Sequence, residues 1–220
     1  MTPDHLLELS FALVARLGVP LAIAAWLTVF GGALAMASIL RSVDTRGVWP
    51  ASLAVGALGL TAHLLDYFVT LRITPDLALE ANPLWRVIID HFGLSLARLY
   101  GLSGKVLLSI LSAQLFAWHL SHRASLFPAR ASGFVDFVQQ LGRGAPRLGN
   151  IRSFFAYAFA LFGPYFFYIT FMNVTGERSY ELYEQLPSPP VAILAYFVGV
   201  TAAYFATMWR AFSSRKASRS

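Results

Sequence analysis

The chain has no cysteine and few charged residues. Of its 220 residues, only 13% are charged, whereas 57% are hydrophobic. The lack of cysteine excludes disulfides, thiolate nucleophiles and thiolate metal sites. Soluble domains carry about 25% charged residues, so the low charge and the high apolar content predict a membrane protein.

Long uncharged runs recur along the sequence. A helix that crosses a bilayer needs about 20 predominantly apolar residues. The runs lack the period-2 alternation of barrel strands. The predicted fold is therefore all-α, an integral membrane bundle of five transmembrane helices in a single domain, 1–220. The predicted spans cover residues 17–40, 49–71, 97–120, 153–173 and 190–210.

Basic residues are concentrated in alternate loops. Eleven of the seventeen Lys and Arg residues lie in loop 41–48, loop 121–152 and the C-terminal tail. The positive-inside rule therefore predicts an external N-terminus and a cytoplasmic C-terminus. This topology, together with the resemblance described below, predicts a multi-pass protein of the inner (plasma) membrane.

The same charge distribution bears on partners. No basic-aromatic recognition module is visible, so nucleic acid is not a predicted partner. The predicted partner is the lipid bilayer, whose anionic headgroups suit a cytoplasmic arginine cluster. A lipid or small-molecule ligand and a membrane-protein partner are further alternatives that the sequence leaves open.

Three local patterns predict features beyond the spans. Gly163–Pro164 should kink the fourth span, because proline removes a helical donor. The aromatic residues around this kink either line a pocket or simply pack tightly. Phe134–Leu141 predicts a short amphipathic helix. Pro83 should open another short helix, with Trp85 as an interfacial anchor.

Four polar residues interrupt the second apolar run. His63, Asp66, Tyr67 and Thr70 are spaced i, i+3, i+4 and i+7, so they share one stripe of a helix. An ionised carboxylate within a span is costly and usually faces protein or a water-filled cavity. Asp66 should therefore have a partner within the bundle.

Lys105 in the third span is the predicted partner of Asp66. At 1.5 Å per residue, Asp66 lies about 7 Å and Lys105 about 12 Å from the outer ends of their helices. We therefore expect the two side chains to face one another. Gly101 and Gly104 are expected to let the second and third spans approach closely.

The loop between these spans carries further polar residues. Glu80 and Asn82 could fold over the Asp66–Lys105 layer. The pattern Asp66-x-x-x-Thr70, Glu80-x-Asn82-Pro83 and Lys105 resembles a family of small prokaryotic polytopic membrane proteins to which no activity is assigned. The resemblance covers about residues 60–110. It implies a shared polar core and supplies no reaction.

Three interpretations of this polar cluster remain open. It is a structural ion pair that fixes helix register, a binding or transport site, or the centre of an enzyme. In the binding interpretation, Asp66, Thr70, Glu80 and Asn82 supply oxygen ligands. In the enzyme interpretation, Asp66 or His63 accepts a proton and Lys105 stabilises developing negative charge.

The catalytic interpretation lacks a recognisable motif. The sequence has no nucleophile elbow, no His-Glu-x-x-His and no glycine-rich phosphate loop. We therefore favour a non-catalytic membrane subunit or binding protein. The alternative is an intramembrane enzyme acting on a lipid or lipid-linked substrate.

Metal binding is the last alternative. His63, Asp66 and Glu80 are suitable ligand types, but the ammonium group of Lys105 nearby would repel a cation. No metal site is therefore predicted, and the sequence identifies no cofactor. His119 and His122, spaced i, i+3, are interpreted as interfacial residues.

Overall fold

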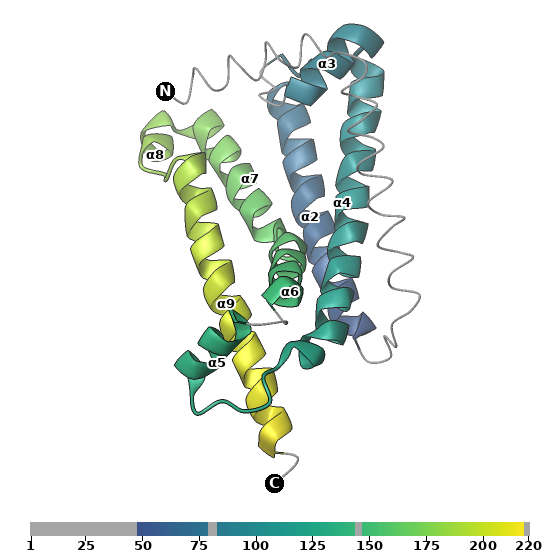
Figure 1. Cartoon of the computed structure of the whole chain (residues 1–220). Coiled ribbons are helices and arrows are strands. Elements are labelled where there is room, and N and C mark those ends of the chain that lie inside the picture. The colour runs from purple at the N-terminus through teal and green to yellow at the C-terminus, as the bar shows by residue number, and fades with distance from the viewer. Residues whose placement is uncertain (1–47, 79–82, 144–146, 218–220) are drawn as a thin grey trace.

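The second to fifth predicted spans are helical. The computed structural model describes residues 48–78, 83–143 and 147–217, which form helices and connecting turns without any strand (Figure 1). Within these described residues, four segments are long and apolar enough to cross a membrane: Trp49–Ile73, Leu94–Leu126, Arg147–Arg178 and Pro189–Arg215. The predicted first span, 17–40, lies outside the described residues.

The long helices run in alternating directions. In chain order the elements are α2 (Trp49–Ile73), α3 (Pro83–Phe92), α4 (Leu94–His122), the 3-10 turn η1 (Arg123–Leu126), α5 (Phe134–Leu141), α6 (Arg147–Ala160), α7 (Gly163–Arg178), α8 (Tyr180–Glu184) and α9 (Pro189–Ala217). Short helices α3 and α8 lie at one end of the bundle, and η1 and α5 lie at the other (Figure 1). The predicted short helices are therefore confirmed at Phe134–Leu141 and after Pro83.

Proline and glycine set the boundaries of α2 and α4. Pro50 occupies the first turn of α2, where its missing N–H costs nothing. The helix ends before Pro75, which disfavours a helical conformation at the preceding residue. Gly93 precedes α4 with φ of 81°, a left-handed conformation that suits glycine. It allows the chain to turn directly from α3 into α4.

The fourth predicted span is broken into two helices. α6 ends at Ala160 and α7 begins at Gly163, so the predicted kink is present. Pro164 lies in the first turn of α7, where it cannot donate the hydrogen bond that would continue α6. The cavity described below is lined by α7, which lies on the C-terminal side of this break.

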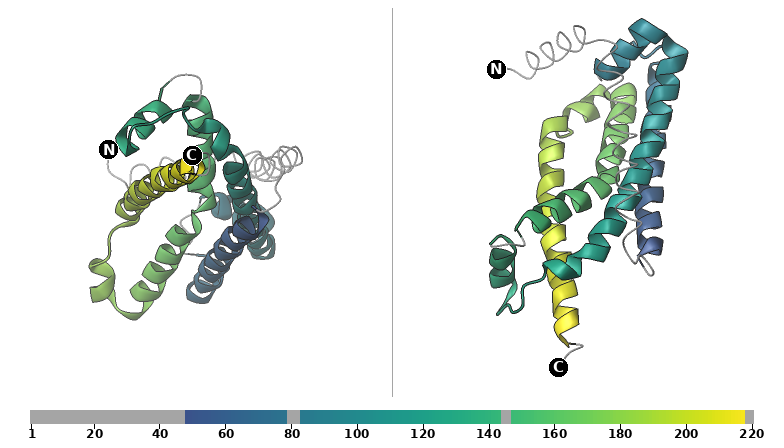
Figure 2. Two further views of the ribbon diagram at one scale, coloured as in Figure 1. Left: turned by 90° about the horizontal axis from the view of Figure 1, so that it is seen from below. Right: turned by 45° about the vertical axis from the view of Figure 1, so that its right-hand side comes forward.

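Helix α2 lies at the centre of the packing. It contacts α4 along one side and α7 along another, while α4 also packs against α6. Helix α9 contacts α6 and α7, and Figures 1 and 2 show it on the side of these helices away from α2. The polar stripe of α2 is therefore positioned between α4 and α7.

Two hydrophobic clusters stabilise opposite ends of the bundle. One joins α5, α6 and α9 through buried residues that include Phe137, Tyr157 and Tyr204. The other joins α2, α3 and α4 and contains Tyr67, Leu77, Trp85, Ile88 and Ala97. Trp85 is only 6% exposed, so the prediction that it is an interfacial anchor is wrong. Its indole ring packs inside the bundle because α3 folds back over the α2–α4 pair.

Glycines do bring helices together, but at positions other than those predicted. A Cβ atom on Gly56 of α2 would lie 2.8 Å from the Ala113 Cβ atom of α4. A Cβ atom on Gly163 would lie 3.2 Å from the Gly59 Cα atom. These two contacts let α2 approach α4 and α7 closely.

The glycines predicted to have this role have other surroundings. A Cβ atom on Gly101 would lie 2.0 Å from Cζ2 of Trp85, so this glycine accommodates an indole ring from α3. A Cβ atom on Gly104 would have no neighbour within 4 Å. The expected close approach of α2 and α4 at Gly101 and Gly104 is therefore wrong.

His119 is also placed differently from the prediction. Its side chain is 1% exposed, and Nδ1 lies 2.8 Å from the hydroxyl oxygen of Ser153 on α6. It is a buried residue that joins α4 to α6, so its interpretation as interfacial is wrong. A hydroxyl on the facing helix satisfies the imidazole inside the bundle, which sequence spacing within α4 alone does not reveal.

Candidate functional site

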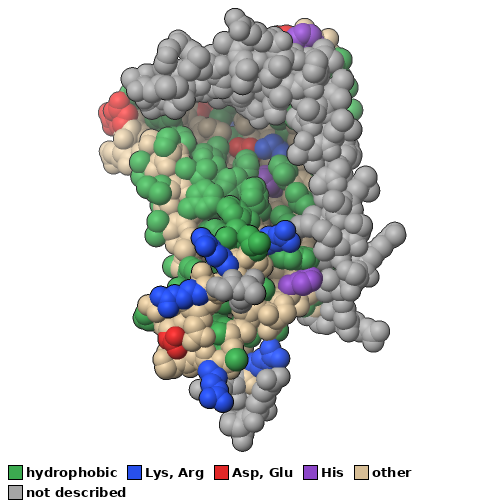
Figure 3. Space-filling view, in the orientation of Figure 1, with side chains coloured by type: hydrophobic (Ala, Val, Ile, Leu, Met, Phe, Trp, Pro, Cys, Tyr) green, Lys and Arg blue, Asp and Glu red, His purple; other side chains and the backbone are tan. Residues whose placement is uncertain are grey.

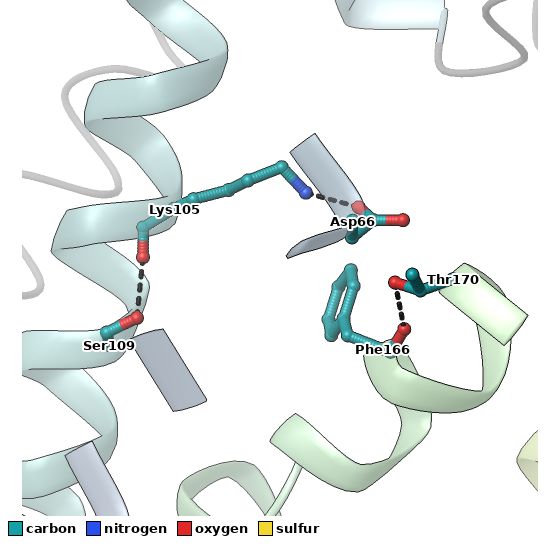
Figure 4. A network of polar contacts seen from close by, with 5 residues as sticks. All are labelled: Asp66, Lys105, Ser109, Phe166 and Thr170. Atoms are coloured by element: carbon teal, nitrogen blue, oxygen red, sulfur yellow. Dashed lines mark hydrogen bonds and ion pairs between the residues drawn. The ribbon is translucent and has the colours of Figure 1, made fainter. Parts of the chain in front are cut away.

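The contact predicted between Asp66 and Lys105 is present. Lys105 on α4 extends its side chain towards α2, and its ammonium Nζ donates a 2.5 Å hydrogen bond to Oδ2 of Asp66 (Figure 4). The two side chains are 13% and 11% exposed, respectively. Because both charges are largely removed from solvent, each is costly to leave without its partner.

An aromatic ring from α7 completes the surroundings of this ion pair. The Lys105 ammonium lies 5.1 Å from the centroid of the Phe166 ring, which is within the range of a cation–π interaction. Figure 4 shows the ring beside the Asp66 carboxylate. The ammonium group therefore has a carboxylate and an aromatic ring as neighbours, from two different helices.

His63 lies one helical turn from Asp66 and is 3% exposed. Its imidazole packs edge-on against Phe166, with a centroid distance of 4.3 Å. The buried Nδ1 atom has no hydrogen-bond partner among the described residues. Buried polar atoms usually have one, so this nitrogen has unused hydrogen-bonding capacity.

Tyr67 belongs to the predicted stripe but faces a different neighbour. Its hydroxyl donates a 3.1 Å hydrogen bond to the backbone carbonyl of Arg98, and its ring packs near Trp85. A stripe with i, i+3, i+4 and i+7 spacing is wide enough for its edges to meet different helices. Tyr67 therefore fixes α2 against α3 and α4, and it does not line the cavity formed by the other three residues.

The other three stripe residues line a cavity between α2, α4 and α7. This cavity has a volume of about 690 Å³, and its walls include His63, Asp66, Thr70 and Lys105. Figure 3 shows acidic, basic and histidine side chains close together in a hollow on this face. On α2 the lining extends from His63 to Ile73, a rise of about 15 Å at 1.5 Å per residue.

Two polar residues of α7 also line the cavity, although the sequence analysis did not assign them to the site. These are Asn173 and Glu177. Together with Phe166 they follow i, i+7 and i+11 spacing, which places all three on one face of a helix. This spacing is the signal that could have found them.

Glu80 and Asn82, also predicted at this site, lie outside the described residues. Pro83, which follows them, begins α3. Trp85 from α3 and Tyr100 from α4 line the cavity. The predicted folding of Glu80 and Asn82 over the ion pair stays a prediction.

The donor set favours binding of a polar group over metal coordination. Within the part of the chain that the structure describes, no three His, Asp or Glu side chains come together as metal ligands. The cavity instead combines carboxylates, an ammonium, an amide and aromatic rings. Such walls can bind a ligand that has both a polar and an apolar part.

Comparisons with known proteins add no family or relative. No protein-family model, curated protein or solved structure matches the chain. The resemblance of residues 60–110 to small prokaryotic membrane proteins therefore stays a prediction.

Proposed function

We propose that this protein is a multi-pass inner-membrane protein that binds a small polar or amphiphilic molecule in the cavity between α2, α4 and α7. The observation that carries this proposal is the position of the Asp66–Lys105 pair in the wall of a cavity of about 690 Å³. A pair that only fixed helix register would not need to line such a space. Charged residues within membrane segments usually mark ligand or ion sites.

The surface of the long helices supports insertion into a bilayer. Large apolar side chains are exposed on all of them, including Leu53, Phe68, Leu99, Phe159 and Leu194. Soluble monomers rarely expose apolar patches of this extent. In the proposed topology the predicted span 17–40 precedes these helices, and the N-terminus is external.

The distribution of charge supports the proposed orientation. Basic side chains gather at the end of the bundle near the C-terminus (Figure 3). They belong to η1, the α5 region and the ends of α6 and α9, and include Arg123, Arg130, Arg143, Arg147, Arg152, Arg210 and Arg215. By the positive-inside rule this end is cytoplasmic, and the end with α3, α8 and Glu177 is external.

The natural absence of cysteine makes this orientation directly testable. Single cysteines can be introduced at Glu181 in α8 and at Ser125 in η1, which are both exposed. A membrane-impermeant maleimide is expected to label Glu181→Cys in intact cells, and Ser125→Cys only after permeabilisation. The reverse pattern would overturn the orientation. Labelling of both positions in intact cells would argue against a membrane-spanning bundle.

A leucine at Gly104 tests the binding proposal by filling the cavity. Gly104 lines the cavity and has room for a side chain, whereas Gly199 on α9 has similar room but lies away from the cavity. Native mass spectrometry from lipid nanodiscs should show a bound small molecule or lipid on the wild type and on Gly199→Leu. In Gly104→Leu we expect retention of this bound molecule to fall about tenfold, because the leucine side chain occupies part of the cavity.

Gly199→Leu is a matched control because both changes replace a helical glycine by a better helix former. Equal retention by all three proteins, or no bound mass on any of them, would contradict the binding proposal.

A further inference from the structure

The charges of the cavity favour one class of ligand. Among the described residues that line it, Asp66 and Glu177 carry negative charge and Lys105 carries positive charge. The Lys105 ammonium already donates to Asp66. The Glu177 carboxylate is therefore a negative charge that no positive charge balances among the described residues of the wall. An entering cation would be attracted to Glu177, whereas an anion would be repelled by it.

The ion pair itself shows how an ammonium group is held here. The Lys105 ammonium has the Asp66 carboxylate and the Phe166 ring as neighbours, a combination that also suits free ammonium ligands. Oδ1 of Asp66 has no hydrogen-bond partner within the described part of the chain. This oxygen can accept a hydrogen bond from a second ammonium group.

His63 is an independent observation in the same part of the cavity. Its side chain is 97% buried, lines the cavity and leaves Nδ1 without a described partner. A neutral imidazole has one nitrogen that accepts a hydrogen bond and one that donates. If Nδ1 is the accepting nitrogen, it can bind an N–H donor of a ligand. If it is the donating nitrogen, it can bind a ligand oxygen that lies beside such N–H donors.

We propose that the cavity binds an ammonium-bearing ligand, either a soluble amine or the amine of a lipid headgroup. This inference rests on the proposed binding function and adds the chemical class of the ligand. The ligand ammonium occupies the space between Asp66 and the Asn173–Glu177 face of α7. The aromatic rings of Phe166, Trp85 and Tyr100 contact its apolar part.

In this arrangement Lys105 competes with the ligand. Its ammonium is attached to a flexible stem and occupies one oxygen of the carboxylate that the ligand uses. An anion could accept only the remaining N–H groups of Lys105, and the carboxylates of Asp66 and Glu177 in the same wall would both repel it. Removing the lysine charge should therefore strengthen binding of amines, an outcome that a purely structural ion pair does not predict.

The experiment compares three matched probes on the purified full-length protein in dodecyl maltoside, an uncharged detergent without nitrogen. The probes are n-butylammonium, n-butyl phosphate and n-butanol, with binding measured by native mass spectrometry titration. We expect the wild type to bind butylammonium about tenfold more tightly than either other probe, as one charge-assisted hydrogen bond provides.

Two charge variants and one control sharpen this test. Lys105→Met keeps the length of the side chain and should raise butylammonium affinity about tenfold. Glu177→Gln, at an exposed position, should lower the butylammonium affinity about threefold, the effect of one screened charge. Glu181→Gln, also exposed but outside the cavity, should leave it unchanged. If Lys105→Met does not fold, the difference between Glu177→Gln and Glu181→Gln still tests the proposal.

The source of the amine is distinguished by adding solubilised phosphatidylethanolamine or phosphatidylglycerol. Displacement of butylammonium by the former lipid alone identifies a lipid headgroup, and displacement by free ethanolamine alone identifies a soluble amine. Both outcomes support the proposal.

Other outcomes overturn it and are separable from failure of the binding function. Butyl phosphate binding as tightly as butylammonium, with both lost in Gly104→Leu, would overturn the ligand class and leave the binding function in place. Lower butylammonium affinity in Lys105→Met than in the wild type would also overturn the ligand class and leave the binding function in place. No binding of any probe, with no Gly104-dependent mass from nanodiscs, would overturn both.

Discussion

Replacing Lys105 by methionine, or Asp66 by leucine, is expected to lower the free energy of unfolding by about 3 kcal/mol. Each change leaves one charge in a largely buried position, where the side chains are only 13% and 11% exposed. This expected loss is at the low end of the usual range for breaking a buried ion pair, because the adjoining cavity gives the remaining charge some access to solvent. Unfolding in mixed micelles, followed by circular dichroism, measures the loss.

The double variant Asp66→Leu/Lys105→Met provides the control. With both charges replaced by apolar groups of similar volume, no uncompensated charge remains, so most of the lost stability should return. Losses that simply add in the double variant would show that the two side chains do not interact in the folded protein.

Exchange of the two charges separates a structural role from binding. Asp66→Lys/Lys105→Asp should restore much of the stability that the single reversals abolish. The exchanged protein should nevertheless lose its ligand, because the ammonium and carboxylate now have different positions relative to Phe166 and Glu177. Ligand retention equal to that of the wild type would argue that the pair serves only to hold α2 against α4.

Gly101→Ala is expected to destabilise the protein by about 2 kcal/mol, the usual cost of an overpacked core. The added methyl group would lie 2.0 Å from Cζ2 of Trp85. The indole is a rigid ring and is buried against Tyr67, so it cannot move aside without disturbing the packing of α3. Thermal unfolding in detergent measures the change.

Gly104→Ala is the matched control for this prediction, one turn along the same helix. A methyl group there meets nothing within 4 Å, so the variant should gain up to about 1 kcal/mol from its higher helix propensity. Equal stability of Gly101→Ala and Gly104→Ala would mean that Trp85 does not pack against α4 as described.

Much of the fold could be predicted because membrane helices follow strong local rules. Apolar run length located α2 and the start of α9 closely, and the Gly163–Pro164 pair located the break between α6 and α7. The Asp66–Lys105 contact followed from the need of a membrane-embedded carboxylate for a partner and from depth, since both residues lie near the same end of adjacent helices. Length and depth are properties of single segments, which a sequence displays directly.

The rest of the site depends on how helices are rotated about their axes and on which helices are neighbours. Asn173 and Glu177 complete the cavity only because α7, and not α9, packs against α2. In the same way, Gly101 marked a close contact correctly, but its partner proved to be the ring of Trp85 and not helix α2. His119 was predicted to be interfacial because its hydrogen-bond partner, Ser153, lies on α6 and cannot be recognised from α4 alone.

The interruption near Leu161 and Phe162 has a mechanical consequence. An unbroken helix would transmit a tilt at one end to its other end. Here α6 and α7 are two shorter helices that meet at the break, and Gly163 at the start of α7 packs against Gly59 of α2. A ligand that pushes α7 outward would therefore tilt α7 and shift its contacts with α9 without tilting α6. The ring contact between Tyr157 of α6 and Tyr204 of α9 lies beyond the break and would stay in place.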